Sequence, residues 1–480
     1  MTTPCLWTSD AMATAMGAAR SGVLPDCITG ISIDSRTLQP GEAYFAIKGD
    51  VHDGHAFVGA ALAAGAALAV VARDKRDQFA ADAPLLIVDD VLDGLRDLAR
   101  AARARLAGRV IAVTGSVGKT STKEALRAVF AAQGETHASV ASFNNHWGVP
   151  LTLARCPASA RYAVFEIGMN HAGEIEKLVE MVRPHVAIIT TVEPVHLEFF
   201  DSVEGIADAK AEIFCAMEPG GAAVLNRDNP HFERLCRRAR ERGIERIVTF
   251  GSDAAADARL IDVALHADCS AVRAEINGLP VTYKLAIPGR HQAMNSLAVL
   301  AAAELAGADL ALAALTLSQV APASGRGVRK LLEIGSSGEA TLIDESYNAN
   351  PASMAAALSV LGAATPGAQG RRIAVLGDML ELGPSSPELH SGLAASVAAN
   401  AVDMVFCCGP MMRHLWDALS PGRQAGYADS SAALESQVVA AIRAGDVIMV
   451  KGSLGSRMKM IVAALEKHYP SSAASSDVAV

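Results

Sequence analysis

The sequence predicts an α/β protein of three domains, of which the central one is built on a parallel sheet covered by helices. Short apolar runs alternate with helical stretches along most of the chain, which is typical of such sheets. The length of 480 residues and the hydrophobic share of 51% allow several buried cores. One apolar run, 109–113, breaks into a glycine turn that leads into a helix expected at 123–132. We therefore expect a central P-loop domain with a parallel sheet, a smaller N-terminal α/β domain and a C-terminal Rossmann-like α/β domain.

The order of these elements sets the predicted domain boundaries. The N-terminal domain is expected at residues 1–107, the central domain at 108–322 and the C-terminal domain at 323–480, with a hinge at 325–327. In the first domain we expect strands at 30–33, 43–47, 67–71 and 85–88 and a helix at 95–106. In the second we expect strands at 110–113, 162–166, 186–191, 222–225 and 246–250, followed by antiparallel strands within 260–285. In the third we expect strands at 340–344, 372–377, 403–407 and 447–450. The polar segment 471–480 is expected to be disordered.

Composition and charge argue against several classes of protein. The net charge is −9 and there is no basic block, so no nucleic-acid partner is expected. The eight cysteines lack metal-finger or C-x-x-C spacing, which predicts reduced, buried thiols of a cytosolic protein. The N-terminus is too polar for a signal peptide and no apolar stretch is long enough to span a bilayer, so we expect a soluble, cytoplasmic protein without a membrane partner.

The glycine turn has the composition of a phosphate-binding loop. Glycines allow backbone N–H groups to surround phosphate oxygens at a helix N-terminus. Lys119 supplies a positive charge for the outer phosphates, and the Thr120 hydroxyl suits Mg²⁺ coordination. The usual pattern has one more glycine, where this chain has Val113. The turn predicts ATP or GTP binding by Thr114, Gly115, Ser116, Val117, Gly118, Lys119, Thr120 and Ser121.

The rest of the chain offers three more candidates for the same site, because the carboxyl ends of parallel strands meet at one edge of a sheet. Glu166 closes a strand, where a carboxylate either reaches a metal ion held by the loop or is structural. His196 follows another strand end and is either a packing residue or a second metal ligand. Lys210 lies in a helical run, where a solvated lysine is the simpler interpretation.

The order and spacing of four motifs carry a family resemblance. The segments TGSVGKT, EIGMNHAGEI, TTVEPVH and AKAEIF resemble the ATP-dependent Mur ligase family of peptidoglycan synthesis, and the resemblance extends to about residue 466. In the N-terminal domain, 34–36 and 46–55 resemble the UDP-sugar module of that family. Three C-terminal segments, 344–351, 376–383 and 450–453, resemble the members that act on a muramyl tripeptide and D-alanyl-D-alanine.

The resemblance implies a two-step reaction with ATP and two Mg²⁺ ions as cofactors. A carboxylate of UDP-MurNAc-tripeptide attacks the γ-phosphate to give an acyl phosphate, and the amine of D-Ala-D-Ala then displaces phosphate. The products are ADP, phosphate and the UDP-MurNAc-pentapeptide precursor of peptidoglycan. A monomer is expected.

The resemblance also implies roles for individual residues. Lys119, Glu166, His196 and Lys210 would be catalytic, with Thr120, Glu166 and His196 as metal ligands. Lys210 matches the lysine that the family carbamylates: its neutral amine combines with CO₂ and becomes an anion that supports Mg²⁺. The phosphate loop would bind ATP together with Asn295, Arg326, Asp344, Tyr347 and Asn348, and the substrates would contact Ser35, Arg36, Lys48, Gly49, Asn144, Asn145 and Lys451. Because these contacts divide between domains, rigid-body closure is expected to gate catalysis.

Several residues keep a second interpretation. His291 lies one helical turn before Asn295 and could be a local helix cap. Asn144 and Asn145 could be turn residues, and Lys451 could be an exposed lysine after its strand. The family commonly has Met-Glu where this chain has Met-Lys at 458–459, so no acidic contact is carried over there.

Other functions make different demands on the sequence. The sibling ligase that adds the third residue typically has Tyr-Ala-His where this chain has 347–350, and folylpolyglutamate synthase lacks the UDP-sugar module. A GTP switch requires an N-K-x-D motif, which the sequence lacks. A P-loop kinase would leave the N-terminal domain unexplained, and an inactive scaffold would leave Lys119, Glu166, His196 and Lys210 without a purpose.

Overall fold

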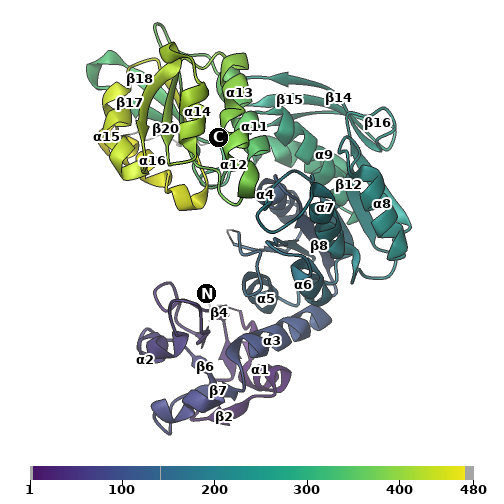
Figure 1. Cartoon of the computed structure of the whole chain (residues 1–480). Coiled ribbons are helices and arrows are strands. Elements are labelled where there is room, and N and C mark those ends of the chain that lie inside the picture. Colours follow the sequence, from purple (N-terminus) through teal and green to yellow (C-terminus); the bar gives the residue numbers. More distant parts are fainter. Residues whose placement is uncertain (1–3, 141, 471–480) are drawn as a thin grey trace.

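The computed structural model describes residues 4–140 and 142–470, and it has three α/β modules along the chain (Figure 1). The purple N-terminal module contacts the central one through helix α3 (Val91–Arg105), which packs on α5 (Gly148–Ala154). The green-to-yellow C-terminal module lies at the other end of the central module. The three-domain α/β fold is confirmed. The predicted domain boundaries stay a prediction, and the predicted disordered segment 471–480 lies outside the described residues.

The N-terminal module is a five-stranded sheet in the order β2-β7-β6-β5-β4, with a separate β1–β3 pair. Ala43 and Phe45 face α1 and α3, whereas Tyr44 and Ala46 face α2, because successive strand residues point to opposite faces. Strands β1, β2 and β3 have only two or three residues each, too short to give a sequence pattern, and they were not predicted. The elements are β1 (Trp7–Thr8), α1 (Ser9–Met16), β2 (Ala19–Ser21), β3 (Cys27–Ile28), β4 (Gly30–Ser32), β5 (Glu42–Phe45), η1 (Gly54–Phe57), α2 (Val58–Ala63), β6 (Leu68–Ala72), η2 (Arg73–Gln78), β7 (Leu85–Val88) and α3.

The start predicted for helix α3, residue 95, is wrong by one turn. The helix begins at Val91, because the Asp90 carboxylate accepts the Asp93 N–H and caps it there. Asp89 and Asp90 interrupt the apolar pattern, although they favour a helix start.

The central module carries a nine-stranded sheet in the order β16-β15-β14-β13-β12-β11-β8-β10-β9. All pairs from β9 to β14 are parallel, and β14, β15 and β16 form the antiparallel extension expected within 260–285. The elements are β8 (Arg109–Thr114), α4 (Lys119–Ala131), β9 (Thr136–Ala138), α5, β10 (Tyr162–Glu166), α6 (Glu174–Val182), β11 (Val186–Ile189), α7 (Val203–Ala211), η3 (Glu212–Phe214), β12 (Ala222–Asn226), α8 (Phe232–Glu241), β13 (Arg246–Gly251), β14 (Ala258–Leu265), β15 (Ser270–Ile276), β16 (Leu279–Leu285), α9 (Arg290–Leu305), α10 (Leu310–Thr316) and η4 (Leu317–Gln319).

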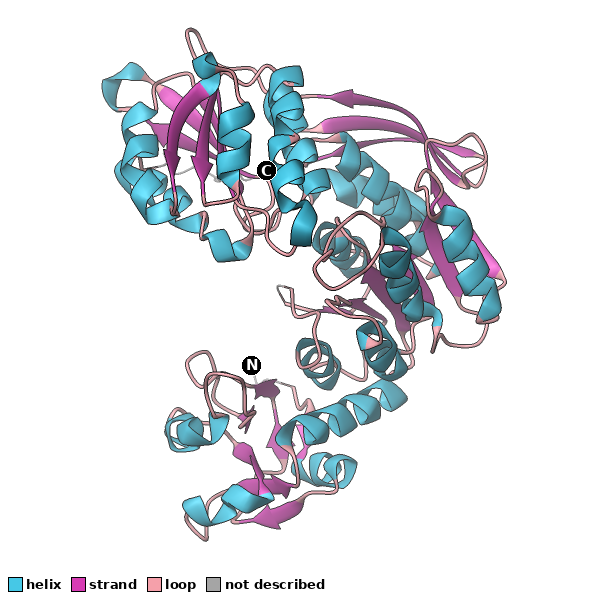
Figure 2. Cartoon of the chain, in the orientation of Figure 1, coloured by secondary structure: helices cyan, strands magenta, loops and turns pink. Residues whose placement is uncertain are grey.

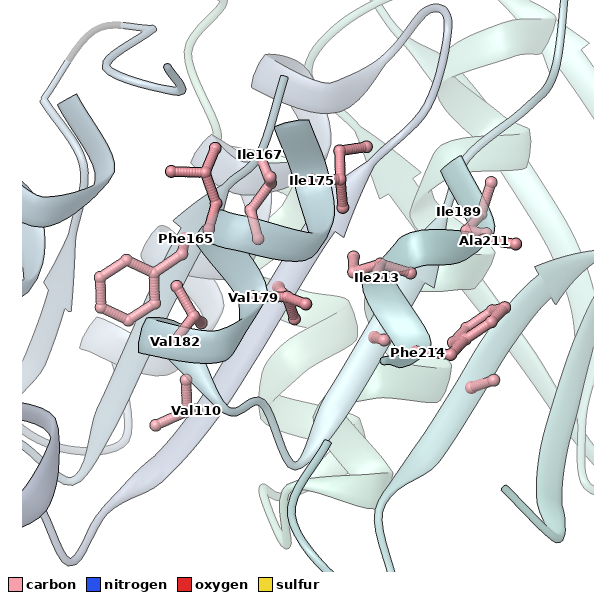
Figure 3. Close-up of a cluster of buried hydrophobic side chains, with 14 of the residues drawn as sticks. Val110, Phe165, Ile167, Ile175, Val179, Val182, Ile189, Ala211, Ile213 and Phe214 are labelled. Atoms are coloured by element: carbon pink, nitrogen blue, oxygen red, sulfur yellow. The ribbon is translucent and has the colours of Figure 1, made fainter. Parts of the chain in front are cut away.

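Helices cover both faces of this sheet, as predicted. Ile111 and Val113 pack under α4 and α9, whereas Val110 and its neighbours pack under α6 and the α7–η3 segment. Figure 3 shows this second cluster, in which Ile213 and Phe214 of η3 lie beside the strands and α6. Burial on both faces explains why the central strands are continuous apolar runs.

The start predicted for the helix after the glycine turn, residue 123, is also wrong. Helix α4 begins at Lys119, directly after Gly118, whose left-handed backbone (φ 87°) ends the turn. Lys119, Thr120 and Ser121 therefore occupy the first helical turn. The polar run KTST hid this start, because it gives no apolar periodicity.

The C-terminal module has a six-stranded sheet in the order β17-β18-β22-β19-β20-β21, parallel except for β17, with helices on both sides (Figure 2). The four predicted strands form its centre. The edge strands β17 and β21 were not predicted, because they lack the continuous burial that produces an apolar run. The elements are β17 (Val328–Glu333), η5 (Gly335–Ser337), β18 (Glu339–Glu345), α11 (Pro351–Ala363), β19 (Arg372–Gly377), η6 (Gly383–Ser385), α12 (Ser386–Ser391), α13 (Leu393–Ala399), β20 (Met404–Cys408), α14 (Met412–Ala418), η7 (Pro421–Arg423), β21 (Gln424–Ala428), α15 (Ser431–Ala441), β22 (Val447–Lys451), η8 (Leu454–Ser456) and α16 (Lys459–His468).

All eight cysteines are free thiols, but the prediction that they are buried holds for only four. Cys5 is exposed, and Cys27, Cys215 and Cys269 are half-buried. None of the helices within residues 4–140 and 142–470 has the length and apolar character needed to cross a membrane.

Candidate active site

The glycine turn at the carboxyl end of β8 has a backbone that only glycine adopts easily. Gly115 has φ 148°, and a Cβ atom there would lie 1.9 Å from the Thr190 hydroxyl oxygen. A Cβ atom on Gly118 would lie 2.7 Å from the Asn295 side-chain nitrogen. The two glycines therefore allow the turn to pack against β11 and α9 at once.

Hydrogen bonds from the end of β11 hold the turn in place. The Thr190 hydroxyl donates to the Val117 carbonyl at 2.6 Å, and the Ser116 N–H donates to the Thr191 carbonyl at 2.9 Å. The Ser116 hydroxyl accepts the Glu193 N–H at 2.9 Å. The turn is thus preorganised by neighbouring strands, as expected for a rigid anion-binding loop.

Lys119 is folded back over this turn. Its ammonium donates to the Gly115 carbonyl at 2.6 Å. Burial lowers the pKa of Lys119, nearby Arg326 lowers it further, and Glu166 opposes both. Two cations and one carboxylate therefore surround the turn, an arrangement suited to a polyphosphate.

Glu166 ends β10 and is almost fully buried, with 1% of its surface exposed. Its Oε1 accepts the Asn144 side-chain N–H at 2.8 Å, whereas its buried Oε2 has no hydrogen-bond partner among residues 4–140 and 142–470. A buried carboxylate oxygen without a partner is costly unless a cation faces it. This oxygen therefore fits a metal ion. Thr120, the other predicted ligand on this side, lies with its hydroxyl 3.3 Å from that of Ser142.

Lys210 lies in the last turn of α7 and is 2% exposed. The apolar side chains that follow it, Ile213 and Phe214, belong to the cluster of Figure 3 and hold this segment in the interior. Within the described part of the chain its ammonium makes no hydrogen bond or ion pair. Burial lowers the pKa of Lys210 well below its usual range, and repulsion from Lys119 adds to this. The interpretation of Lys210 as a solvated lysine, which the helical pattern suggested, is therefore wrong.

His196 reaches across to the C-terminal module. Its Nδ1 lies 2.6 Å from Oε2 of Glu381, and this contact lowers the pKa of the Glu381 carboxyl. Across residues 4–140 and 142–470, no three His, Cys, Asp or Glu side chains converge as a metal-binding group. A metal site here would therefore need Thr120, a modified Lys210 or phosphate oxygens as further ligands.

The predicted nucleotide-binding residues come from both modules. Asn295 lies on α9 beside Gly118, and the Arg326 guanidinium stacks on the Tyr347 ring, 4.2 Å from its centroid. Asp344 is buried near the end of β18, where it accepts the Ser346 hydroxyl at 2.6 Å. His291 is not the helix cap, because the N-cap of α9 is Gly289 and no side chain makes a capping hydrogen bond there.

Lys451 ends β22 and is buried, so the exposed lysine considered for this position is excluded. Its ammonium donates to the Glu345 carboxylate and to the Asn348 carbonyl, both at 3.1 Å. Glu345 ends the neighbouring strand β18, so the pair lies at the carboxyl edge of the second sheet.

One cavity of about 650 Å³ lies between the two modules and brings most of these side chains together. Those that line it among the predicted site residues are Ser116, Val117, Gly118, Lys119, Thr120, Ser121, Asn144, Glu166, His196, Asn295, Arg326, Tyr347, Asn348 and Lys451. The predicted residues outside its lining are Thr114, Gly115, Asn145, Lys210 and Asp344, together with Ser35, Arg36, Lys48 and Gly49 of the N-terminal module. The Asn145 side-chain oxygen accepts the Gly148 N–H at 2.9 Å, at the first residue of α5.

The N-terminal candidates lie in turns of their own module. Arg36 is exposed and pairs with Asp34 through two bonds of 2.9 and 2.7 Å, which lowers the pKa of Asp34 to about 2. The Gly49 N–H donates to the His52 carbonyl, and Lys48 forms a β-bridge with Asp53.

Sequence reasoning assigned no role to several residues that line the cavity. Glu345 and Glu381 stood inside motifs used for the resemblance, and Glu345 also closes a strand, as Glu166 does. The strand-end position would have found Glu345. Only the contact between modules reveals Glu381. Further lining residues without an assigned role include Ser142, Thr190, Glu193 and Gln292.

The fold and the cavity define a class of protein: a P-loop enzyme with a phosphate loop on a parallel sheet and a second α/β module across the cavity. Three family models match the chain in order: "Mur ligase family, catalytic domain" at residues 27–103, "Mur ligase middle domain" at 113–303 and "Mur ligase, glutamate ligase domain" at 332–454. The chain belongs to the Mur ligase family, whose members are ATP-dependent enzymes that form amide bonds.

Similar proteins cover nearly the whole chain. The UDP-N-acetylmuramoyl-tripeptide–D-alanyl-D-alanine ligase of Escherichia coli (strain K12) is 34% identical over 449 residues, 92% of this chain and 94% of the relative. The ligase of the same name from Rickettsia prowazekii (strain Madrid E) is 30% identical and covers 95% of this chain and 99% of its own. The crystal structure of MurF from Acinetobacter baumannii has a TM-score of 0.82 at 28% identity, covering 96% and 99%. MurF ligase from Thermotoga maritima in complex with ADP has a TM-score of 0.75 at 25% identity, covering 92% and 97%.

Proposed function

We propose that this chain joins D-alanyl-D-alanine to UDP-N-acetylmuramoyl-tripeptide with ATP as the energy source. The observation that carries the proposal is the shared cavity, with the phosphate loop and Lys119 on one wall and Lys451 on the other. A carboxyl group activated on the first wall can there meet an amine held on the second. Relatives with this activity in their name match the chain over 95% and 92% of its length.

The reaction has two chemical steps. A carboxylate oxygen of the tripeptide bonds to the γ-phosphorus of ATP and the bond to the bridging oxygen of ADP breaks, which gives an acyl phosphate. The amine of D-Ala-D-Ala then bonds to the acyl carbon and loses a proton, and the bond to phosphate breaks. The first step brings two anions together, so Lys119 and Arg326 supply positive charge at the phosphates.

Thr120, Glu166 and His196, with Lys210 as a carbamate, would hold two Mg²⁺ ions. Mg²⁺, when bound, neutralises phosphate charge and so favours attack by the carboxylate. Oε2 of Glu166, which has no hydrogen-bond partner in the described part of the chain, supports this assignment, and Asn144 orients the same carboxylate through Oε1.

The surroundings of Lys210 support its carbamylation. Its lowered pKa favours the neutral amine, and only the neutral amine reacts with CO₂. The nitrogen bonds to the carbon of CO₂ and releases a proton, so a group that would repel Mg²⁺ becomes an anion.

The remaining assignments follow the two sides of the cavity. Asn295 would contact adenine and Asp344 the ribose, with Tyr347 and Asn348 beside them. Lys451 would contact the dipeptide or the acyl phosphate. The N-terminal module would bind the UDP-muramyl part through Ser35, Arg36, Lys48 and Gly49, and Asn144 and Asn145 would hold the peptide. The enzyme would act as a cytoplasmic monomer, and closure of the C-terminal module would exclude water from the acyl phosphate.

The test supplies purified protein with Mg·ATP, UDP-MurNAc-tripeptide and one candidate amine at a time. Phosphate release and the product mass are measured. We expect turnover with D-Ala-D-Ala and a product equal to tripeptide plus dipeptide minus water. Turnover with L-Ala, D-Glu or a diamino acid, but not with D-Ala-D-Ala, would contradict the proposal.

A further inference from the structure

Among the described residues, one hydrogen-bonded side-chain pair joins the central and C-terminal modules at the lining of the cavity. Nδ1 of His196, from the central module, lies 2.6 Å from Oε2 of Glu381, from the C-terminal module. A backbone bond runs alongside it, from the Glu198 N–H to the Glu381 carbonyl at 3.4 Å. Both side chains line the cavity.

The His196 side of this pair is tied to the phosphate loop. His196 has a left-handed backbone (φ 56°), which a non-glycine residue adopts only where its surroundings enforce it. Three residues earlier, Glu193 exchanges hydrogen bonds with the Ser116 hydroxyl, and the Asn229 side chain donates to the Val192 carbonyl. The histidine therefore stands on a segment fixed to the loop.

The Glu381 side is tied to the opposite wall. Glu381 also has a left-handed backbone (φ 62°). The Leu380 N–H donates to the Ser453 hydroxyl at 3.0 Å, and the Met379 N–H donates to Nε2 of His390 at 3.0 Å. Ser453 lies two residues after Lys451, so Glu381 is held beside the wall of the cavity that carries Lys451.

The contact decides which imidazole nitrogen is available. A carboxylate only accepts, so in the neutral ring Nδ1 carries the proton and Nε2 carries the lone pair. Metal-binding histidines commonly donate their other N–H to a carboxylate, which fixes both the tautomer and the ring orientation.

We propose that Glu381 is a positioning residue that orients His196 as a metal ligand and does so only while the C-terminal module is docked. The inference rests on the proposed function, because it takes His196 as a ligand of Mg²⁺. Glu381 supplies the carboxylate that accepts the Nδ1 proton of His196, and it belongs to the C-terminal module. Docking of the C-terminal module, which carries Lys451, therefore organises the metal site beside the phosphate loop. This couples docking of that module to activation of the substrate carboxylate by ATP.

The test measures Mn²⁺ binding by electron paramagnetic resonance on the full chain with the non-hydrolysable ATP analogue AMP-PNP. We expect Glu381→Ala to weaken Mn²⁺ binding by about 10–100-fold. Glu381→Gln should weaken it less, because the amide oxygen still accepts the Nδ1 proton. The matched control is Glu388→Gln, an exposed glutamate on α12 of the same module, which should leave Mn²⁺ binding unchanged.

A double-mutant cycle separates positioning from a merely structural bond. If Glu381 acts through His196, then Glu381→Ala should weaken Mn²⁺ binding less than about twofold in a His196→Ala background. An equal loss in both backgrounds, or Mn²⁺ binding of Glu381→Ala within twofold of the wild type, would overturn the proposal. The measurement needs neither D-Ala-D-Ala nor turnover, so it is independent of whether D-Ala-D-Ala is the amine.

Discussion

Two buried lysines, one in each module that bounds the cavity, have opposite surroundings. Lys210 of the central module is 2% exposed, and among the described residues its ammonium has no hydrogen-bond or ion-pair partner. Lys451 of the C-terminal module is 3% exposed, but its ammonium contacts the Glu345 carboxylate and the Asn348 carbonyl. Burial is the same, whereas compensation of the charge differs.

This difference shows that a partner, and not depth, decides what a buried lysine can do. Burial of an ammonium without compensation favours its neutral, nucleophilic amine form, and burial accordingly lowers the pKa of Lys210. An ammonium held by a carboxylate serves as a fixed donor and positive charge. The first is suited to reaction with CO₂ and the second to holding an anionic ligand.

The largest effect is expected at the third lysine of the site. Lys119→Ala should lower turnover by about 10³-fold or more, because the outer phosphates lose their nearest fixed charge. Phosphate release under saturating Mg·ATP measures this. The same substitution at Lys177, which is exposed on α6, should leave the rate unchanged. Retained activity in Lys119→Ala would mean that the loop does not bind the transferred phosphate.

Lys210→Met should separate activity from stability. Turnover should fall by about 10²-fold or more. In metal-free protein without CO₂, in which Lys210 is unmodified, the free energy of unfolding should rise by about 1–3 kcal/mol, because a buried amine that has no partner among the described residues is removed. A lysine whose pKa is lowered in the folded state binds its proton more tightly when unfolded, so wild-type stability increases with pH up to about 10.4, the unfolded value. The gain from Lys210→Met should therefore be larger at pH 7 than at pH 10.

Urea unfolding of Lys210→Met at both pH values, with Lys177→Met as the exposed control, checks this. A loss of stability in Lys210→Met would show that the ammonium has a partner in the folded protein.

Lys451→Met should lower both the free energy of unfolding and the catalytic efficiency. Glu345 and the Asn348 carbonyl would lose their donor, which should cost about 2 kcal/mol of unfolding free energy. The kcat/KM for the dipeptide should fall by about 10²-fold. Urea unfolding and steady-state kinetics measure the two effects. A stability change of the same sign as in Lys210→Met would break the contrast between the two lysines.

The smallest expected effect is on stability, and it concerns the lysine that begins one helix of the central module and one of the C-terminal module. Lys119 begins α4 and Lys459 begins α16, and a cation at this position opposes the helix dipole. In α4 the phosphate would compensate, whereas Lys459 is exposed and has no role in the proposed site. Lys459→Glu should therefore stabilise the protein by about 0.3–1 kcal/mol without changing turnover. Lys467→Glu, in the last turn of α16, should be destabilising by a similar amount. Equal effects of the two would exclude the dipole as the cause.

Much of the fold could be predicted because buried parallel strands leave apolar runs in the sequence. Strands such as β8, β10 and β22 were found in this way, and Glu166 was found as the polar residue that ends one of them. The edge strands β17 and β21 of the C-terminal sheet and the start of α4 were not found, because half-buried or polar segments have no such pattern. The site residues could be gathered only as motifs, and their roles remain predictions.

The sequence by itself determined the local chemistry: which residues form the turn, which strands end in a carboxylate or lysine, and which family the motifs resemble. The tertiary structure alone decided which of these groups have partners. In the part of the chain that the structure describes, Lys210 has none, Lys451 contacts Glu345 from a strand about a hundred residues away, and His196 contacts Glu381 from another module. The physical reason is that compensation of a buried charge depends on atoms within a few ångströms, and the packing of distant segments sets which atoms those are.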